Sequence, residues 1–571
     1  MGGPRSVLQH GRWTLELRGD EVADIAYDGV LLLRAIRPVV RDQDWNTVPP
    51  RVLAPPRRNG TEVVVALRFE LDDIGYAVDL TVRLSADELV VDFDGRAETA
   101  FHRNRIGLVV LHPASETGRE VAVRHTNGSV TRGRWPEQIS PHQPFTDVAG
   151  YAWTRDELAA ELTLSGDVFE NEDQRNWTDA SFKTYSTPLD RPFPVPVAVG
   201  ERLRQQARLR VSDQVGSPRS RLHGRDVVTV HRAVVAHLPP LSLSGSLYPP
   251  PVTLTGLGPG YEAVLVELAD VEERWPGLLA MAAEQAAALG AEVDVRLVTA
   301  HPEAVARGVA MLRDLPVRRL AAFDPDSHLS AAPLWAALRR AAEEAAFGGQ
   351  LLGGTRAHFT ELNRGKAAQP EDLPALTFSL TPSMHATELP HLLDSLRTQR
   401  TVVENAVRIA AGRPVHVGPV TLARRFNAVA TSGRPDPATE ARRAVDSLQH
   451  TTFAAAWTLA SVRALSVPGV AGLTYYETAG DRGLLVSDRP AGVIPSPAGQ
   501  VLNLLAAAAG QPILDAKVPA DLAALPLAKT GRGTELLLAD LSGQDREVLV
   551  CFEDQTALVP LAGWAVGRIM L

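Results

Sequence analysis

The sequence predicts a multidomain α/β + β protein with an N-terminal antiparallel β-sandwich, a central (β/α)8 barrel and a small C-terminal β-domain. From about residue 10 to residue 215, apolar and polar residues alternate in short runs, the pattern of half-buried strands. Between about residues 252 and 510, β-rich runs alternate with Ala/Leu-rich stretches whose apolar residues recur every three or four positions. Alternating strands and helices predict a parallel sheet covered by helices.

The length of 571 residues corresponds to about three or four domains. We place the β-sandwich at residues 1–225, the barrel at 226–512 and the C-terminal β-domain at 513–571.

The two β-domains are predicted from runs with a two-residue period. Residues 61–71, 76–84 and 88–93 form such runs in the first domain, separated by Asp, Gly, Ser and Asn clusters. Residues 534–540 and 547–552 repeat the pattern near the end of the chain.

The barrel is predicted from seven clear strand candidates and a weak eighth, near 484–487. The seven are 263–268, 292–298, 318–323, 351–359, 375–380, 415–422 and 472–476. About 260 residues with seven or eight β-then-α units match the size of a (β/α)8, or TIM, barrel. An open doubly wound sheet is the competing arrangement.

Helices are expected between these strands, on apolar spacing and on proline and glycine positions. They are expected at 275–289, 302–312, 334–347, 389–411 and 437–465.

Composition and charge exclude several classes of protein. The net charge of −9 comes without a basic stretch interleaved with aromatic residues, so no nucleic-acid partner is expected. Apolar runs fall well short of the ~20 residues that cross a bilayer, and the N-terminus lacks a secretory apolar region, so we expect a cytoplasmic protein without membrane contact. The single cysteine, Cys551, excludes an intrachain disulfide. The oligomeric state is left open, a homo-oligomer included.

Common catalytic motifs are missing from the sequence. It contains no GxSxG, no GxxxxGK[ST] and no HExxH, and the glycines of 256–260 lack the spacing of a dinucleotide loop. The segment from Asp324 to His328 offers oxygen and nitrogen donors, but its composition equally suits a plain turn. We therefore expect no metal and no cofactor.

Two glutamates are the candidate catalytic residues. Glu361 follows the predicted fourth strand and Glu477 ends the predicted seventh. In a (β/α)8 barrel, the carboxyl ends of the strands converge on one rim, so the two carboxylates would face each other across the mouth. Such a pair suits general acid and base, or acid and nucleophile. For either residue alone, a role as helix N-cap partner or surface charge is the simpler interpretation.

Polar and aromatic residues near these glutamates are candidates for substrate binding. On the rim they are His358, Asn363, Arg364, His385, Tyr475 and Tyr476. A polar run in the β-sandwich, 172–185, would add Asp173, Arg175, Asn176 and Lys183 if it reaches the barrel, whereas a solvated edge loop is the alternative.

Several blocks of the sequence resemble the bacterial D-apionate lactonases. The blocks are 111–113, 139–145, 172–185, 358–364, 379–388 and 475–480. The resemblance implies an N-terminal β-domain, a central barrel and a C-terminal β-domain, with hydrolysis of a sugar lactone such as D-apionolactone as the activity. It implies no catalytic residues.

Three functions are compared. In a lactonase, Glu477 would take a proton from water, Glu361 would protonate the ring oxygen, and His358, His385 or Arg364 would stabilise the oxyanion. In a retaining glycoside hydrolase, whose strand-four and strand-seven glutamates these resemble, Glu477 would be the nucleophile and Glu361 the acid/base, although Thr360 stands where that pattern has asparagine. A non-catalytic carbohydrate-binding protein is the third.

Overall fold

The computed structural model describes residues 5–213, 226–246, 254–269, 271–430, 437–488, 492–529, 531 and 533–571. The described chain forms two compact units. One holds residues 5–175 and 179–213 with 429–430, and the other holds residues 176–178 and all other described residues from 226 onward. The expected first boundary, at residue 225, lies outside the described residues.

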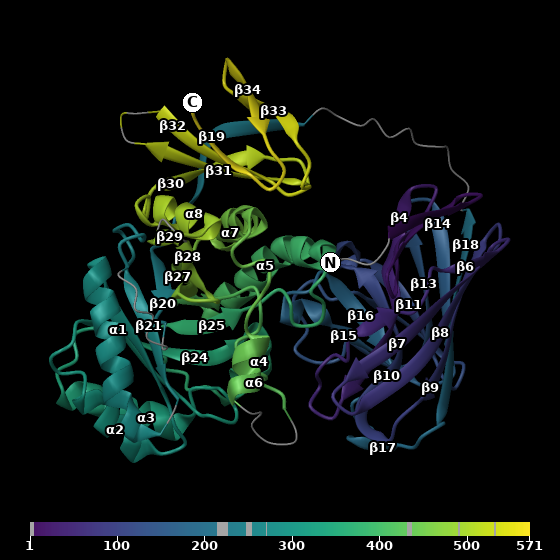
Figure 1. The fold of residues 1–571 in the computed structure, drawn as a ribbon, viewed down its shortest axis with the longest axis horizontal. Helices are drawn as coiled ribbons and strands as arrows, with labels where there is room; N and C mark the ends of the chain where they lie inside the picture. Colours follow the sequence, from purple (N-terminus) through teal and green to yellow (C-terminus); the bar gives the residue numbers. More distant parts are fainter. Residues whose placement is uncertain are drawn as a thin grey trace. The chain divides into compact units, whose positions relative to one another are not determined.

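The first unit is an antiparallel β-domain (Figure 1, purple to teal). Its strands are β1 (Arg5–His10), β2 (Trp13–Arg18), β3 (Glu21–Tyr27), β4 (Val30–Asp42), β5 (Pro50–Val52), β6 (Arg57–Asn59), β7 (Glu62–Leu71), β8 (Ile74–Leu84), β9 (Glu88–Ala97), β10 (Phe101–Pro113), β11 (Glu120–His125), β12 (Val130–Arg134), β13 (Phe145–Arg155), β14 (Leu158–Ser165), β15 (Phe169–Asp173), β16 (Ser181–Tyr185), β17 (Val195–Val197) and β18 (Arg202–Asp213).

Alternating burial along these strands explains why the two-residue period was readable. Along β7, every second residue from Val63 to Phe69 is buried. The inward residues join one apolar core with buried tryptophans such as Trp13 and Trp135. The antiparallel β-domain predicted from the sequence is confirmed.

The second unit contains a closed barrel of eight parallel strands. They are β20 (Leu241–Ser244), β21 (Ala263–Leu268), β22 (Glu292–Val298), β23 (Val317–Phe323), β24 (Gln350–His358), β25 (Leu376–Leu380), β26 (Val415–Val420) and β27 (Val470–Ala479). Each strand pairs in parallel with the next, and β27 pairs in parallel with β20, which closes the ring. The (β/α)8 barrel is confirmed.

The count of barrel strands corrects the sequence analysis. The first strand, β20, has only four residues and follows two prolines, so it gave no periodic signal. The weak eighth candidate is β28 (Gly483–Asp488), which pairs with the end of β27 and with β29 (Gly492–Pro495), outside the ring. Glu361 therefore follows the fifth strand and Glu477 lies on the eighth.

Helices occur in all five expected ranges, and two more, at 359–365 and 497–506, were not expected. The described residues form eight α-helices in all. They are α1 (Trp275–Leu289), α2 (Pro302–Ala310), α3 (Ala332–Glu344), α4 (Phe359–Gly365), α5 (Leu389–Ala410), α6 (Pro437–Arg443), α7 (Thr452–Leu465) and α8 (Pro497–Ala506). The single helix expected at 437–465 is two helices, α6 and α7. Between them the Asp446 carboxylate accepts the Leu448 N–H at 2.8 Å, a local turn that competes with helix.

The barrel interior carries a buried polar layer. Arg319 donates to Asp294 at 2.9 Å and to the hydroxyl of Ser242 at 2.9 Å. Arg296 donates to the carbonyl of Gly418 at 3.0 Å, across the ring from β22 to β26. These contacts tie the strands together beneath the mouth.

The C-terminal sheet contains one strand from before the barrel. β19 (Val227–His237) pairs with β30 (Pro512–Lys517) and β33 (Arg546–Phe552), although the sequence analysis placed its residues in the barrel segment. Figure 1 shows β19 in teal among yellow strands. The other members are β31 (Leu522–Lys529), β32 (Gly533–Asp540), β34 (Gln555–Leu561) and β35 (Val566–Met570).

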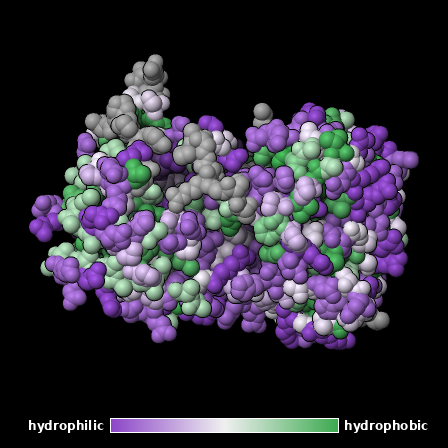
Figure 2. Space-filling view, turned by 90° about the horizontal axis from the view of Figure 1, so that it is seen from below, coloured by the Kyte–Doolittle hydropathy of each residue, from purple (hydrophilic) through white to green (hydrophobic). Residues whose placement is uncertain are grey.

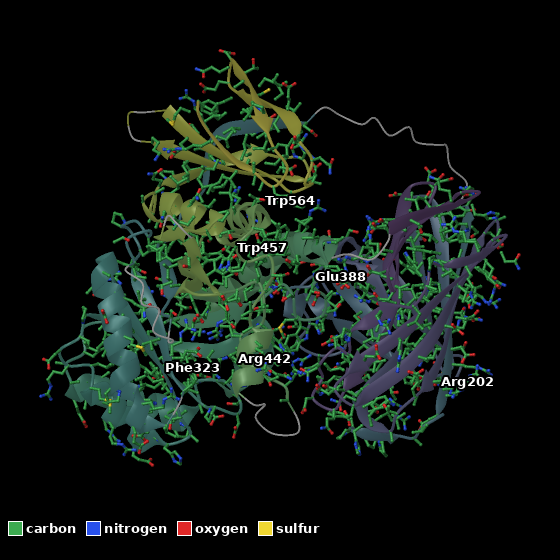
Figure 3. The ribbon with its side chains drawn as sticks, in the orientation of Figure 1. Arg202, Phe323, Glu388, Arg442, Trp457 and Trp564 are labelled. Atoms are coloured by element: carbon green, nitrogen blue, oxygen red, sulfur yellow. The ribbon has the colours of Figure 1, made fainter. Side chains whose placement is uncertain are left out.

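Helix α7 joins the barrel to this sheet. It packs on β27 and on β31, and its Phe453 ring lies 5.2 Å from the Trp564 ring, centroid to centroid. Trp457, on the same helix, is fully buried and donates to the carbonyl of Leu392 on α5 (Figure 3).

The face drawn in Figure 2 is largely hydrophilic, with hydrophobic residues in smaller areas between. This fits the burial of most large apolar side chains in the cores. In the part of the chain that the structure describes, no helix has the length and apolar character needed to cross a membrane.

Candidate active site

An ion pair crosses the barrel mouth. Glu267 lies near the carboxyl end of β21, the second strand, and Arg356 lies on β24, the fifth. Nη2 of Arg356 donates to Oε2 of Glu267 at 2.8 Å. Strands two and five are not neighbours in the ring, so this contact is made through the barrel interior, at the end where barrel enzymes carry their sites.

Arg425, from the loop after β26, joins this pair. Its Nη1 lies 3.1 Å from Oε2 of Glu267, and its Nη2 donates to the carbonyl of Arg356 at 2.6 Å. Burial alone would raise the pKa of the Glu267 carboxyl, but Arg356, Arg425 and Arg296 outweigh burial and hold that pKa well below its ordinary value. Glu267 is therefore an ionised acceptor and a weak base.

His328 and Phe426 fix the two guanidiniums. Phe426 lies against both, with its ring centroid 4.2 Å from Cζ of Arg356 and 5.2 Å from Cζ of Arg425. Nη1 of Arg356 lies 3.3 Å from Nδ1 of His328. Burial, followed by the charge of Arg356, lowers the pKa of His328 to about 4, so at neutral pH its ring is uncharged and Nδ1 can accept.

Glu477 lies on β27, the eighth strand, in an ion pair with Arg482 at 2.7 Å. Burial raises the pKa of its carboxyl above the ordinary value, while the charges of Arg482 and Arg425 oppose the rise. An ionised carboxylate with a raised pKa has the character of a general base. Arg425, which contacts Glu267 directly, thus lowers the pKa of both the Glu267 and the Glu477 carboxyl groups by its charge.

Glu361 lies in the first turn of α4, where its Oε2 accepts the backbone N–H of His358 at 2.9 Å. The helix-capping interpretation of this residue is therefore correct. Burial also raises the pKa of its carboxyl to about 7, against opposing backbone hydrogen bonds and the charge of Arg364. A carboxyl group partly protonated at neutral pH remains suited to proton donation.

Trp177 brings three of the predicted binding residues together. Its ring centroid lies 6.1 Å from that of His358 and 5.7 Å from that of His385, and Cζ of Arg364 lies 5.8 Å from it. Burial, and then the charges of Arg425 and other cations, lower the pKa of His358 to about 3, so its ring is neutral.

Asn176 also belongs to the barrel unit. Its carbonyl accepts the hydroxyl of Thr360 at 2.8 Å and its Oδ1 accepts from Nδ2 of Asn363 at 2.9 Å. Asn176 and Asn363 therefore hold the start of α4, which carries Glu361.

Tyr475 and Tyr476 do not have the position expected for stacking on a sugar. Both are fully buried, and their hydroxyls bond those of Ser461 and Thr458 on α7 at 2.8 and 2.9 Å. They hold β27 against α7.

Three residues of the polar run stay within the first unit. Asp173 and Arg175 are buried and form an ion pair with each other at 2.7 Å. Lys183 pairs with Glu172 at 2.5 Å and lies 4.8 Å from the Tyr185 ring. These contacts give Asp173, Arg175 and Lys183 structural partners in the β-domain.

The sequence analysis missed the charged group at the centre of the mouth. Glu267 and Arg356 lie inside strands whose pattern read as ordinary sheet, and Arg425 lies in a loop without motif. A charge one or two residues before the end of an apolar strand is the signal that could have revealed the first two.

Among the described residues, no group of three or more His, Cys, Asp or Glu side chains is arranged to hold a metal ion. In the segment considered for metal binding, the Asp324 carboxylate accepts the backbone N–H groups of Asp326 and Ser327 and the Ser327 hydroxyl. This is the geometry of a side-chain-closed turn.

Two family models match the chain. The model described as "D-apionate lactonase, N-terminal domain" matches residues 3–214, and "D-apionate lactonase, TIM barrel domain" matches residues 254–510. The chain belongs to the D-apionate lactonase family. A curated member, D-apionate lactonase from Brucella anthropi, is 27% identical over an alignment of 534 positions that covers 84% of this chain and 83% of that protein.

Two solved structures of glycoside hydrolases resemble part of this chain. A GH51 arabinofuranosidase from Xanthomonas axonopodis pv. citri has 11% identity and a TM-score of 0.41, covering 61% of this chain and 98% of that one. A glycoside hydrolase family 30 subfamily 8 xylanase from Clostridium acetobutylicum has 9% identity and a TM-score of 0.38, and the match covers 58% of this chain and 88% of the xylanase.

Proposed function

We propose that this protein is a sugar-lactone hydrolase that opens D-apionolactone, or a closely related lactone, to the aldonate. The proposal rests on the family match across both large domains, together with a relative named D-apionate lactonase. The charged barrel mouth adds the chemistry that ester hydrolysis needs: a half-buried carboxylate base, a carboxyl group partly protonated at neutral pH and guanidiniums for a developing negative charge. We place the reaction in the cytoplasm.

Glu477 is the proposed base. Its carboxylate takes a proton from water as the water oxygen bonds to the lactone carbonyl carbon, and the carbonyl becomes an oxyanion. The Arg482 ion pair keeps Glu477 ionised, while burial makes its carboxylate a better base than a solvated one. Arg425, whose charge lowers the pKa of Glu477, is the group that we propose to stabilise the oxyanion.

Glu361 is the proposed acid. When the oxyanion collapses, the bond between the carbonyl carbon and the ring oxygen breaks, and the ring oxygen takes the Glu361 proton to become a hydroxyl group. The new carboxylic acid then releases a proton to solvent at neutral pH, and the proton held by Glu477 restores Glu361 through water. Every bond and proton is accounted for without a cofactor.

A retaining glycoside hydrolase is the weaker proposal. Glu361 follows strand five and Glu477 lies on strand eight of the ring, rather than four and seven, and Thr360, which binds Asn176, stands before Glu361. The Glu361 carboxylate also caps α4 through Oε2. These features differ from the pattern that suggested the alternative.

The experiment is a substrate panel assayed by proton release. We expect turnover of D-apionolactone and other five-membered aldonolactones, and none of aryl glycosides. In H2¹⁸O, one ¹⁸O atom should enter the product carboxylate, because water attacks the carbonyl carbon.

Glu477→Gln tests the base, and Glu303→Gln is its matched control, since Glu303 is an exposed carboxylate on α2. The first should lower kcat by about 10²–10⁴-fold, and the second should leave it unchanged. Lactone turnover that survives Glu477→Gln would refute the mechanism and leave the activity standing. Turnover of aryl glycosides without lactones would overturn the proposed function.

A further inference from the structure

The mouth of the barrel holds more positive than negative charge around Glu267. Arg356 and Arg425 both bind this single carboxylate, and the side chains of Glu267 and Arg356 are each 11% exposed. The third cation acting on Glu267, Arg296, lies 3.9 Å from Asp294, a carboxylate that also binds Arg319. In the described parts of the chain, the two guanidiniums at the mouth therefore share one carboxylate as their ion-pair partner.

The hydrogen-bonding atoms of this group are unevenly used. Both arginines contact the same oxygen of Glu267, Oε2. The other oxygen, Oε1, is buried without a hydrogen-bond partner among the described residues, and so is Nε of Arg356. An unpaired buried donor and an unpaired buried acceptor both destabilise the fold, so the arrangement is suited to a ligand that supplies a partner for each.

Rigid neighbours hold these unpaired atoms in place. Phe426 packs against both guanidiniums, and His328 contacts Nη1 of Arg356. The guanidiniums of Arg356 and Arg425 offer positively charged donors, and Oε1 of Glu267 beside them offers a negatively charged acceptor. A ligand with a carboxylate and a hydroxyl on the neighbouring carbon would match both. The guanidinium fork binds carboxylates through paired N–H groups, and a carboxylate oxygen accepts a hydroxyl proton.

We propose that Arg356, Arg425 and Glu267 form a subsite for 2-hydroxycarboxylates, in which the arginines bind the carboxylate of the aldonate product and Oε1 of Glu267 accepts its 2-hydroxyl. This inference rests on the proposed function and deepens it, because it names the residues that distinguish an aldonate from a neutral polyol. In the proposed reaction the carboxylate forms at the carbon that water attacks, where Arg425 is the proposed partner of the oxyanion.

The subsite also predicts product inhibition. The neutral lactone carries no charge for the arginines to bind, whereas the aldonate carries one full negative charge. The same residues that stabilise a growing negative charge should therefore retain the product after ring opening.

Calorimetric titration with D-apionate and D-apiitol tests this inference without requiring turnover. The two ligands differ only in carboxylate against hydroxymethyl. We expect D-apionate to bind at least tenfold more tightly. Arg425→Gln should weaken the binding of D-apionate about 10–100-fold and the binding of D-apiitol less than twofold. Arg307→Gln, which removes an exposed guanidinium paired with Glu272 on the barrel surface, is the matched control and should change neither.

Glu267→Gln provides a readout that general damage to the site would not give. It removes the negative charge beside the arginines, so D-apionate should bind more tightly than to the wild type, the opposite sign from Arg425→Gln. Equal affinities for the two ligands, or weaker D-apionate binding in both variants, would overturn the inference. If the protein hydrolyses lactones but binds D-apionate no more tightly than D-apiitol, the subsite is refuted and the proposed function stands. If it binds D-apionate more tightly but hydrolyses no lactone, the proposed function is refuted and the subsite stands.

Discussion

Replacing Glu361 by glutamine tests the proton donor and the effect of burial on stability in one variant. Oε2 of Glu361 accepts the N–H of His358, and a glutamine amide oxygen can accept the same bond, so α4 should keep its first turn. The variant loses only the proton that the carboxyl group can donate and the charge that it can acquire.

The structure sets the size of both effects. Burial raises the pKa of Glu361 from 4.5 to about 7. The folded protein then holds this proton more tightly than the unfolded chain, so the free energy of unfolding falls as pH rises between these two values. At ~1.36 kcal/mol per pH unit, the free energy of unfolding falls by about 3 kcal/mol over this range. Glutamine does not titrate, so the variant should not show this fall. For catalysis, only about one tenth of the carboxyl groups remain protonated at pH ~8, one unit above that pKa.

Two measurements read these effects. In the wild type, kcat followed by proton release should fall about tenfold per pH unit above pH ~7, whereas Glu361→Gln should lower kcat ~10²–10⁴-fold and remove that decline. In urea unfolding, the free energy of unfolding of the variant relative to that of the wild type should rise by about 3 kcal/mol from pH ~5 to pH ~8. A decline in kcat that persists in the variant would exclude Glu361 as the donor, and a stability difference independent of pH would refute its raised pKa.

Three further changes test other parts of the structure. Tyr476→Phe should lower the free energy of unfolding by about 1–3 kcal/mol in urea, because it leaves a buried hydroxyl of α7 without its partner, and an unchanged stability would contradict this. Asp173→Asn should cost about 3–5 kcal/mol by leaving Arg175 buried without a counter-charge, with no direct effect on KM, whereas a large change in KM with unchanged stability would restore the predicted binding role. Arg482→Gln should raise the pKa of Glu477, moving the acidic limb of the kcat profile to higher pH, and an unmoved limb would argue against Glu477 as the base.

The architecture was predictable wherever burial has a regular period along the chain. β21 and β22 coincide with their expected ranges, because β21 reads as a nearly continuous apolar run and Val293, Val295 and Leu297 recur at every second position of β22. α1 coincides as well, ending at Gly290 in a left-handed conformation that glycine adopts without strain. The four residues of β20 were too few for such a pattern, and this omission shifted the strand numbers of both glutamates.

The candidate site was predictable only in part, because its residues act through partners far away in sequence. Glu361 and Glu477 were proposed from their place at strand ends, and their catalytic roles stay a prediction. The hydroxyls of Tyr475 and Tyr476 bond to α7, which strand position alone does not reveal. Trp177 was seen as part of a polar run, whereas its contacts with His358 and His385 depend on where that segment packs.

The sequence by itself determined the antiparallel β-domain, the (β/α)8 barrel and the C-terminal sheet, because the period of buried residues is a local property of a chain. It also determined the family resemblance, because contiguous motifs are local as well. Only the tertiary structure decided that Glu267, Arg356 and Arg425, separated by up to 158 positions, form one charged group at the mouth. Ring closure between β20 and β27 is the physical reason, because it brings non-neighbouring strands face to face across a shared interior. In that interior, low exposure to water gives these charges their strength.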